Sequence, residues 1–372
     1  MSNARNLANL LGTDTKIKTA DIADEVFNSN RNLVINGAMQ VSQRGTSDTG
    51  VHASGYYSCD RFSVYYNAED ELRNTITQAS DGPDGFANSF KIETTTAESA
   101  VASDERLYVM YKAEAQDLQS LGFGTSAAKK TTLSFYVKSS VTGTYAVSLY
   151  QSDGNDLIGS TYTINSANTW ERKTITFAGN TAAAVADDNG IGIIVYFGIM
   201  LGSDWTSGSN TSWAEFASAN FFAGHAQNGV ATTANATWQI TGVQWELGEQ
   251  ATPFEHRSFA DELARCQRYY WQVAGQNQIV GQGFYYSTSE FDCIVDLPQT
   301  MRASPTFTPS NNSGDFNIAY TTDLFDTWSG IQFFDGTRVN IYATSGVSGT
   351  KGDSSYVRLM NSTSKVQFDA EL

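Results

Sequence analysis

Residues 131–179 alternate apolar and polar side chains in four short runs, separated by turns that contain Gly or Asn. The runs are Leu133–Val137, Tyr145–Leu149, Thr161–Ile164 and Trp170–Phe177. In an extended chain a period of two puts successive side chains on opposite faces, so one face is buried and the other meets water. Such runs at short spacing predict antiparallel strands of a β-sandwich rather than βαβ units.

The flanking segments extend this pattern, and we expect about ten strands before residue 258, enough for one jelly-roll sandwich. They include Arg31–Gly45, Tyr56–Tyr66, Ile191–Met200 and Ala236–Leu247. Gly242 interrupts the alternation of the last segment and predicts a β-bulge. Asp153–Asp156 (DGND) lacks the EF-hand spacing and its closing Glu, so it predicts a hairpin turn instead of a calcium loop. The predicted fold class is all-β.

A domain boundary is expected near Gly248–Ser258. Phe259–Tyr270 then predicts a short helix, because Phe259, Leu263 and Cys266 recur at helical spacing and two acidic residues occupy the first turn. The chain after it returns to short β runs as far as residue 369. The predicted parts are an N-terminal segment 1–30, a jelly-roll domain 31–257, and a smaller C-terminal β-sandwich domain 258–372 that the helix opens.

The charge balance limits the possible partners. The formal net charge is −16, from 23 Lys and Arg against 39 Asp and Glu. Nucleic acids and anionic membranes require clustered cations, so the balance argues against both. Cys59, Cys266 and Cys293 form no CxxC pair and predict neither a disulfide scaffold nor a zinc site. No apolar run reaches the length of about 18 residues expected of a membrane span, and no signal-peptide core is evident.

Residues 1–30 contain two short amphipathic segments, Ala4–Leu11 and Thr19–Phe27. Isolated helices shorter than about 12 residues are marginal in water, so these segments need a partner to become ordered. One interpretation is an attachment segment, and the alternative is a disordered leader. The apolar residues that would make the attachment are Leu7, Leu10, Leu11, Ile22, Val26 and Phe27.

The sequence contains no recognisable catalytic or metal-binding constellation. His52, His225 and His256 are far apart, share no motif with a carboxylate or cysteine, and are expected on the surface. HExxH, GxSxG and phosphate-binding glycine motifs are absent from the sequence. Paired carboxylates for glycoside hydrolysis are set by the fold, so 39 acidic residues carry no information about them. We therefore expect a non-enzymatic protein with no cofactor and no metal.

The aromatic residues provide the remaining candidates. Trp205 and Trp213 lie in a polar, loop-like segment, where flat rings can stack on the apolar face of a sugar. The alternative is that both rings cover the sandwich or a seam between subunits. Three further tryptophans within predicted strands are expected in the core: Trp170, Trp238 and Trp245. Three aromatic residues at the end of the predicted helix are expected to join the domains: Tyr269, Tyr270 and Trp271.

Several stretches together resemble tail-fibre and other virion structural proteins of tailed phages. They are Asn32–Gly45 (NLVINGAMQVSQRG) followed by Asp60-Arg61-Phe62, Trp238–Arg257 with Glu262–Trp271, Pro298–Thr306 (PQTMRASPT), and Asp369–Leu372 (DAEL). The resemblance implies a virion fibre or adhesin, assembled in the host cytoplasm, that attaches to other virion proteins through residues 1–30. It also implies a homotrimer that presents its β-sandwich domains to a host-surface glycan. The alternatives are a structural head-fibre, collar or decoration protein without a receptor, and a glycan depolymerase.

The first domain is also similar to galactose-binding-like jelly-rolls, which many carbohydrate-binding modules share. Those modules open with NLL-x-NG-x-FE and close with V-x-LE-x-G. Glu246 matches the closing carboxylate, whereas Gln40 stands where the opening one would help hold a structural calcium ion. A hard cation requires several oxygen ligands, so the resemblance does not carry a calcium site over to this chain.

Overall fold

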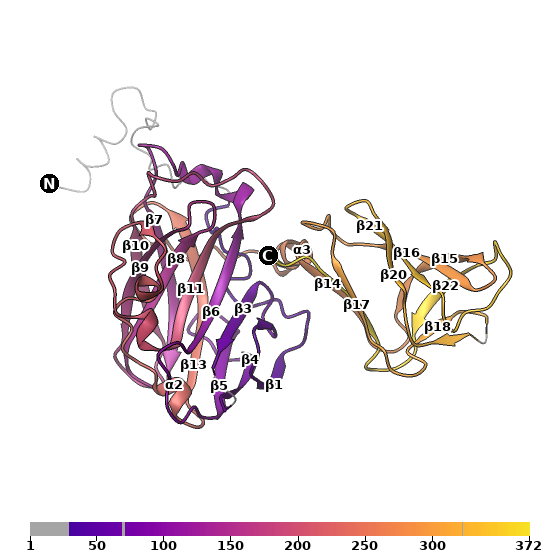
Figure 1. Cartoon of the computed structure of the whole chain (residues 1–372), viewed down its shortest axis with the longest axis horizontal. Helices are drawn as coiled ribbons and strands as arrows, with labels where there is room; N and C mark the ends of the chain where they lie inside the picture. The colour runs from indigo at the N-terminus through magenta and orange to yellow at the C-terminus, as the bar shows by residue number, and fades with distance from the viewer. Residues whose placement is uncertain (1–29, 69–70, 322) are drawn as a thin grey trace.

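The computed structural model describes residues 30–68, 71–321 and 323–372, and it confirms the all-β prediction (Figure 1). The predicted attachment residues Leu7, Leu10, Leu11, Ile22, Val26 and Phe27 lie outside these ranges. The first half of the chain forms two antiparallel sheets packed face to face. The first sheet has the order β1 (Ser47–Val51), β4 (Arg73–Ala79), β5 (Ser89–Thr96), β13 (Thr237–Leu247), β7 (Thr131–Ser139) and β10 (Glu171–Phe177). The second has the order β12 (Ala214–Glu215), β9 (Asp156–Ile164), β8 (Gly143–Gln151), β11 (Ile191–Leu201), β6 (Arg106–Glu114), β3 (Phe62–Asn67) and β2 (Gly55–Tyr56).

Alternation places the predicted apolar residues between these two sheets. Leu133, Phe135 and Val137 of β7 are fully buried, as are Trp238 and Trp245 of β13. The bulge predicted at Gly242 is present, because the β13–β7 register shifts between Thr241 and Gln244. The hairpin predicted at 153–156 is also present, with Gln151 opposite Asp156.

Trp170 is an exception, and its prediction as a core residue is wrong. It precedes β10, which is an edge strand, and it is only half-buried. Its Nε1 donates to Oδ1 of Asp81 at 3.3 Å, and the Lys138 ammonium lies 5.0 Å from the ring centroid. An edge position leaves one side of this ring without a neighbouring strand to cover it.

Arg31–Gly45 was predicted as a strand but forms turns and irregular backbone. The Asn32 side chain supplies the hydrogen bonds that a ladder would have provided: Nδ2 donates to the Val243 carbonyl, and Oδ1 accepts from the Val34 and Trp245 amides. Asn36 has a left-handed backbone with φ of 61° and bridges Val41 and Asp60 through its side chain. The predicted strand Tyr56–Tyr66 is likewise interrupted by a turn between β2 and β3.

The described residues also form short helices: η3 (Ala115–Leu121), η4 (Ser203–Trp205), η5 (Ser218–Asn220) and α2 (Gly229–Thr232) between jelly-roll strands, and α3 (Phe259–Gln267) between β13 and the next strand of the chain. Helix α3 is shorter than predicted, and Tyr270 already belongs to the next strand. Ser258 caps α3 by accepting a hydrogen bond from the Asp261 amide at 3.2 Å. Cys266 and Tyr269 pack into the jelly-roll core, whereas Phe259 is 57% exposed. The helix predicted to open the second domain therefore packs on the first.

The rest of the chain forms a smaller pair of antiparallel sheets with its own core. A three-stranded sheet contains β14 (Tyr270–Ala274), β23 (Lys365–Asp369) and β17 (Thr306–Pro309). A seven-stranded sheet contains β19 (Leu324–Phe325), β18 (Phe316–Ile318), β22 (Ser354–Leu359), β15 (Ile279–Ser287), β16 (Glu290–Asp296), β21 (Arg338–Ala343) and β20 (Gly330–Phe334). In the described residues, no helix is long and apolar enough to cross a membrane.

A buried network of charged and aromatic groups joins the two halves beside α3, where Figure 1 also marks the C-terminal end. The fully buried guanidinium of Arg61 binds the Glu371 carboxylate and the Lys112 carbonyl, and lies 3.5 Å from the centroid of the Tyr269 ring. Arg302 donates to the backbone carbonyls of residues 370 and 371. Burial alone would lower the pKa of Arg61, but the nearby Glu371 carboxylate raises it and the net shift is upward, so the buried guanidinium stays charged.

A second arginine extends this network. The Arg44 guanidinium lies 3.6 Å from the Tyr270 ring centroid and 3.0 Å from Oδ2 of Asp369. Trp271 stacks on Phe368 in the second core. Of the three aromatic residues predicted to join the domains, Tyr269 packs in the jelly-roll core and Trp271 in the second core. Tyr270 contacts both halves, through Arg44 and through Gln367. The three cysteines are free thiols and are buried.

Candidate functional site

The outer face of the second jelly-roll sheet carries tyrosines where strand alternation alone would favour polar residues. The inward residues of β6, such as Leu107 and Val109, pack in the core, and the outward residue between them is Tyr108. The same alternation turns Tyr65 of β3, Tyr150 of β8 and Tyr196 of β11 to this outer face. Neighbouring strands thus bring four phenol rings to one surface.

A loop from residue 202 to 226 packs against this surface and adds further rings. Tyr65 and Tyr108 stack with centroids 4.8 Å apart, and Tyr108 meets Tyr196 edge-on at 5.2 Å. The Phe221 ring of the loop packs edge-on against Tyr196 with centroids 4.8 Å apart, and the Phe216 ring packs against Tyr150 with centroids 5.8 Å apart. The loop and the sheet together form a second apolar cluster outside the sandwich core.

A cavity of about 320 Å³ opens between the loop and the sheet. It is lined by Arg106, Tyr108, Tyr150, Asn155, Tyr196, Phe216 and Phe221. Most of its lining residues are aromatic, while Asn155 is exposed and accepts a hydrogen bond from the Tyr150 hydroxyl at 3.0 Å. Apolar walls with a few fixed polar groups are the usual composition of a small-molecule site.

The polar groups of this cavity are well defined. Burial raises the pKa of Tyr108 and of Tyr196, so both phenols remain protonated and can donate hydrogen bonds at neutral pH. The Arg106 guanidinium lies 3.7 Å from the Trp205 ring centroid and donates to the Tyr65 hydroxyl at 3.2 Å. The cavity therefore offers neutral hydroxyl and amide groups together with one cation fixed by stacking.

The two tryptophans predicted to bind a sugar lie in different clusters. Trp205 borders the outer-face cluster, where its Nε1 donates to the Asp104 carbonyl at 2.9 Å and Arg106 covers its ring. Trp213 packs against Phe123 at the margin of the sandwich core, and its Nε1 donates to the Ala178 carbonyl at 2.6 Å. Both indoles are half-buried, as in the alternative in which they cover the sandwich. Sugar binding by either residue stays a prediction.

Sequence reasoning missed the tyrosines of the cavity. Each lies in a strand of the second sheet, one position away from a core residue. Outward aromatic residues at such positions are a usable signal, because a solvated strand face normally carries polar side chains. The repeated outward tyrosines in β3, β6, β8 and β11 could therefore have indicated this surface.

His225 anchors the loop to the sheet, and its prediction as a surface residue is wrong. It is only 7% exposed, because the loop folds back over the strands. Its Nδ1 lies 3.2 Å from the Ala146 amide, and its Nε2 lies 2.6 Å from the Gln227 carbonyl. These partners suit a neutral ring that accepts at Nδ1 and donates at Nε2. Burial lowers the pKa of His225 to about 4. His52 and His256 are exposed, as predicted.

His225 should make stability depend on pH in a defined window. Its pKa is lower in the folded state than the ordinary value of about 6.5, so unfolded chains bind more protons below that pH and stability falls. Between pH 7 and pH 5 the wild type should lose about 2 kcal/mol that His225→Asn does not lose. Urea unfolding at both pH values measures this difference. His52→Asn is the control and should lose as much stability between pH 7 and pH 5 as the wild type. Equal losses in all three proteins would contradict the prediction.

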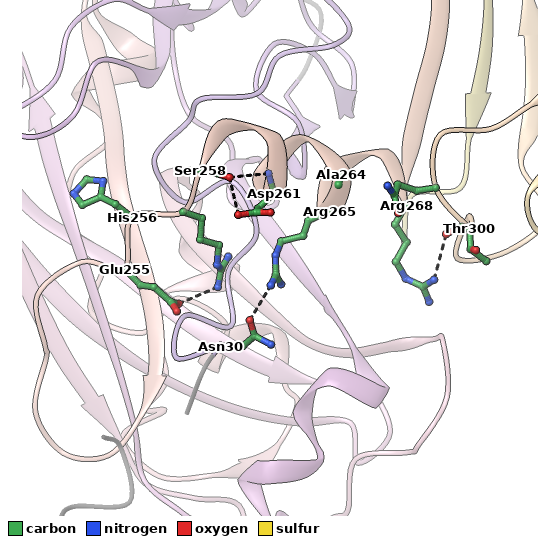
Figure 2. Close-up of a pocket in the computed structure, with 11 residues that line it drawn as sticks. Asn30, Glu255, His256, Ser258, Asp261, Ala264, Arg265, Arg268 and Thr300 are labelled. Atoms are coloured by element: carbon green, nitrogen blue, oxygen red, sulfur yellow. Dashed lines mark hydrogen bonds and ion pairs between the residues drawn. The ribbon is translucent and has the colours of Figure 1, made fainter. Parts of the chain in front are cut away.

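A larger cavity, of about 710 Å³, runs along α3 (Figure 2). Its lining combines Arg257, Arg265 and Arg268 with Glu255 and Asp261. These arginines already serve the structure. Arg265 donates to Asn30, Arg268 binds the buried Glu114, and Arg257 holds the carbonyls of residues 32 and 34. We therefore favour the smaller aromatic cavity as the functional site.

The carboxylate that matches the closing glutamate of the galactose-binding-like modules has partners within the chain. Glu246 is fully buried, accepts hydrogen bonds from the amide and hydroxyl of Thr252, and lies 3.4 Å from Nε of Arg31. In the described residues, no group of three His, Cys, Asp or Glu side chains has metal-site geometry. Arg31 thus supplies positive charge beside Glu246.

Comparisons with known proteins found structural similarity only. No protein-family model and no curated protein matches the sequence. A CBM4 domain is 13% identical with a TM-score of 0.29, over 57% of this chain and 98% of that one. The family 11 carbohydrate-binding module of a cellulosomal cellulase from Clostridium thermocellum is 11% identical with a TM-score of 0.28, over 55% of this chain and 99% of that one. The enzymatically active domain of tailspike protein 4 of bacteriophage CBA120 is 12% identical with a TM-score of 0.32, over 59% of this chain but 22% of that one. Identities and scores this low leave the ligand to be argued from the geometry above.

Proposed function

We propose that this chain is a non-catalytic glycan-binding protein whose ligand occupies the aromatic cavity on the outer face of the jelly-roll. One observation carries the proposal: tyrosine and phenylalanine rings line an open cavity whose polar groups are phenols, an amide and one arginine. Sugar rings present C–H groups on one face and hydroxyls at the edge. Aromatic rings pack on the C–H face, and donors and acceptors such as Asn155 bind the hydroxyls at the edge.

The size of the cavity supports a small part of a glycan as the occupant. Ligand cavities span about 300–1,000 Å³, and this one lies at the lower end of that range. It is open to solvent on the surface of a sheet, so a longer chain can continue beyond it. The lining contains no Asp or Glu, and glycoside hydrolysis generally uses a pair of carboxylates. This composition favours binding over cleavage.

We further propose a place for this binding activity. The likeness of several sequence stretches to tailed-phage virion proteins supports a fibre or adhesin that is attached through residues 1–30 and displays the jelly-roll to the host surface. A head-fibre, collar or decoration protein without a receptor is the second candidate. Antibody labelling of intact particles distinguishes the two, since a tail adhesin is labelled at the tail and a decoration protein at the capsid.

Removing one ring of the cavity should weaken glycan binding. Tyr150 is half-buried and lines the cavity, so Tyr150→Ala should raise the dissociation constant about tenfold, the equivalent of about 1.4 kcal/mol. A bacterial glycan array identifies the oligosaccharide, and calorimetry measures its affinity for wild type and variant.

Tyr136→Ala is the matched control, because Tyr136 is a half-buried tyrosine of β7 in the other sheet. Its affinity should equal that of wild type. An array without any bound glycan, or equal affinity for Tyr150→Ala and wild type, would refute the proposed site. Release of reducing ends from the bound polysaccharide would instead identify a depolymerase.

A further inference from the structure

The aromatic cavity carries positive charge that no lining residue balances. Arg106 is the cation among its lining residues, and no Asp or Glu belongs to that lining. Strand alternation puts Arg106 on the same face of β6 as Tyr108, whereas the neighbours Glu105 and Leu107 are buried on the other face. The cavity thus combines apolar walls with one positive charge, and this combination limits the kind of sugar that fits.

Aromatic rings hold the Arg106 guanidinium in place. Its central carbon lies 3.7 Å from the centroid of the Trp205 ring and 5.0 Å from that of the Tyr65 ring. Nη2 donates to the Tyr65 hydroxyl at 3.2 Å. The Trp205 indole is fixed in turn by its hydrogen bond to the Asp104 carbonyl at 2.9 Å. A guanidinium held in this way loses little side-chain freedom when it binds an anion.

The charge of Arg106 is not neutralised by a carboxylate of the chain. Other arginines have such a partner, as Arg61 has in Glu371 and Arg268 has in Glu114. Arg106 makes no ion pair within the described residues. Its Nε is buried, but its Nη1 is not, and Nη1 makes no hydrogen bond there either. Arg106 therefore keeps a donor and a full charge for a ligand.

The other polar groups of the cavity can donate hydrogen bonds as well. Burial raises the pKa of Tyr108 and of Tyr196, although the Arg106 charge opposes the rise, so both phenols keep their protons. Neither hydroxyl makes a hydrogen bond within the described chain. Nδ2 of Asn155 is also free, because the Tyr150 hydroxyl binds its Oδ1. A carboxylate only accepts hydrogen bonds, so donors grouped around one cation favour it over a neutral hydroxyl.

The order of the strands separates the cation from the amide. Strand β11, which carries Tyr196, lies between β6 with Arg106 and β8 with Tyr150. Asn155 follows β8 in the chain and lies on the β8 side, where it binds Tyr150. A sugar ring over Tyr196 can therefore turn a carboxylate toward Arg106 and its hydroxyls toward Asn155.

We propose that the sugar bound in the aromatic cavity is acidic and that Arg106 binds its carboxylate. This inference rests on the proposed glycan site and names the class of sugar that occupies it. One cation balances the single charge of a carboxylate, whereas a phosphate dianion would need more than one. The net charge of −16 opposes an acidic ligand only weakly at the cavity, because salt screens exposed charges beyond about 8 Å at physiological ionic strength.

A glycan array of matched pairs tests the proposal on the full chain. Each pair contains an oligosaccharide with glucuronate, galacturonate or sialate and the same oligosaccharide with its carboxyl group reduced to an alcohol. For the pair that binds best, calorimetry should give wild type a dissociation constant at least tenfold lower for the acidic form. Raising sodium chloride from about 50 to about 500 mM should weaken binding of the acidic form more than that of the reduced form.

Variants of Arg106 should change the ratio of the two dissociation constants. Arg106→Gln should bring the ratio close to one, and Arg106→Lys, which keeps the charge, should retain part of the preference. Arg73→Gln is the control, because Arg73 is a half-buried arginine of β4 in the other sheet and does not line the cavity. It should keep the wild-type ratio. A variant that only loosens the cavity weakens both forms alike and leaves the ratio unchanged.

The outcomes separate this inference from the glycan site itself. Equal affinity of wild type for acidic and reduced forms, with both weakened by Tyr150→Ala, would overturn the inference and keep the site. A preference for the acidic form that persists in Arg106→Gln, or that is lost equally in Arg73→Gln, would also overturn the role of Arg106. If no glycan of the array binds, the site fails and the inference fails with it.

Discussion

Arg61→Met is expected to lower the free energy of unfolding by about 3–5 kcal/mol, because it removes one member of a buried ion pair. The Arg61 side chain is fully buried and that of Glu371 is 4% exposed. Methionine fills similar volume, but among the described residues it leaves Arg44, 3.4 Å away, as the remaining ion-pair partner of the Glu371 carboxylate, and it removes the Arg61 donor from the Lys112 carbonyl. The loss should appear in urea unfolding as a lower midpoint.

A matched control separates burial from loss of charge. Lys130 pairs with Glu249 at 3.1 Å, but both side chains are more than half exposed. Exposed pairs contribute about 0–1 kcal/mol, so Lys130→Met should change stability little. Adding Glu371→Gln to Arg61→Met should restore part of the loss, since the stranded charge is then removed. Equal midpoints for Arg61→Met and Lys130→Met would contradict the role assigned to this network.

Gly37→Ala is expected to destabilise the protein by about 3 kcal/mol through steric conflict alone. A Cβ at residue 37 would lie 2.1 Å from the Val243 carbonyl oxygen, a backbone atom held in β13. Gly37 and Val243 are also joined by a hydrogen bond of 2.9 Å from the Val243 amide to the Gly37 carbonyl. The backbone of residue 37 therefore cannot move away without breaking its attachment to the bulge.

Gly55→Ala provides the comparison for this steric effect. A Cβ at residue 55 would make ordinary contacts of 3.5 Å with the Tyr57 ring. Neither glycine has a positive φ, so alanine strains neither backbone. In thermal unfolding the midpoint temperature should fall clearly for Gly37→Ala and change little for Gly55→Ala. A Gly37→Ala protein as stable as wild type would show that the loop 31–45 is not fixed to β13.

These two predictions concern the same region, because the stretches that resemble virion proteins meet beside α3. The turn 31–45 binds β13, and the Asn36 amide donates to Glu262 of α3. Arg61 reaches Glu371, and Arg302 binds the backbone of residues 370 and 371. The motifs thus form the junction between the two halves of the chain, and none of them lines the aromatic cavity. Their physical role is to hold the domains together.

Local patterns in the sequence determined the strands and the sandwich core, since alternation alone decides which residues of an extended run share a face. Leu133, Phe135 and Val137 are buried as expected, and the bulge falls at Gly242. Arg31–Gly45 was mistaken for a strand because it is rich in apolar residues such as Val34 and Ile35, while asparagine side chains supply its hydrogen bonds.

Only the tertiary structure decided the rest, because it depends on contacts between residues far apart in the chain. Arg61 and Glu371 are 310 positions apart, and neither identifies the other in the sequence. His225 is buried, and Tyr108 and Tyr196 line a cavity, because loop 202–226 folds over the outer sheet face. A two-residue period tells which side chains point away from the core, but what then covers that face is decided by the path of the distant chain.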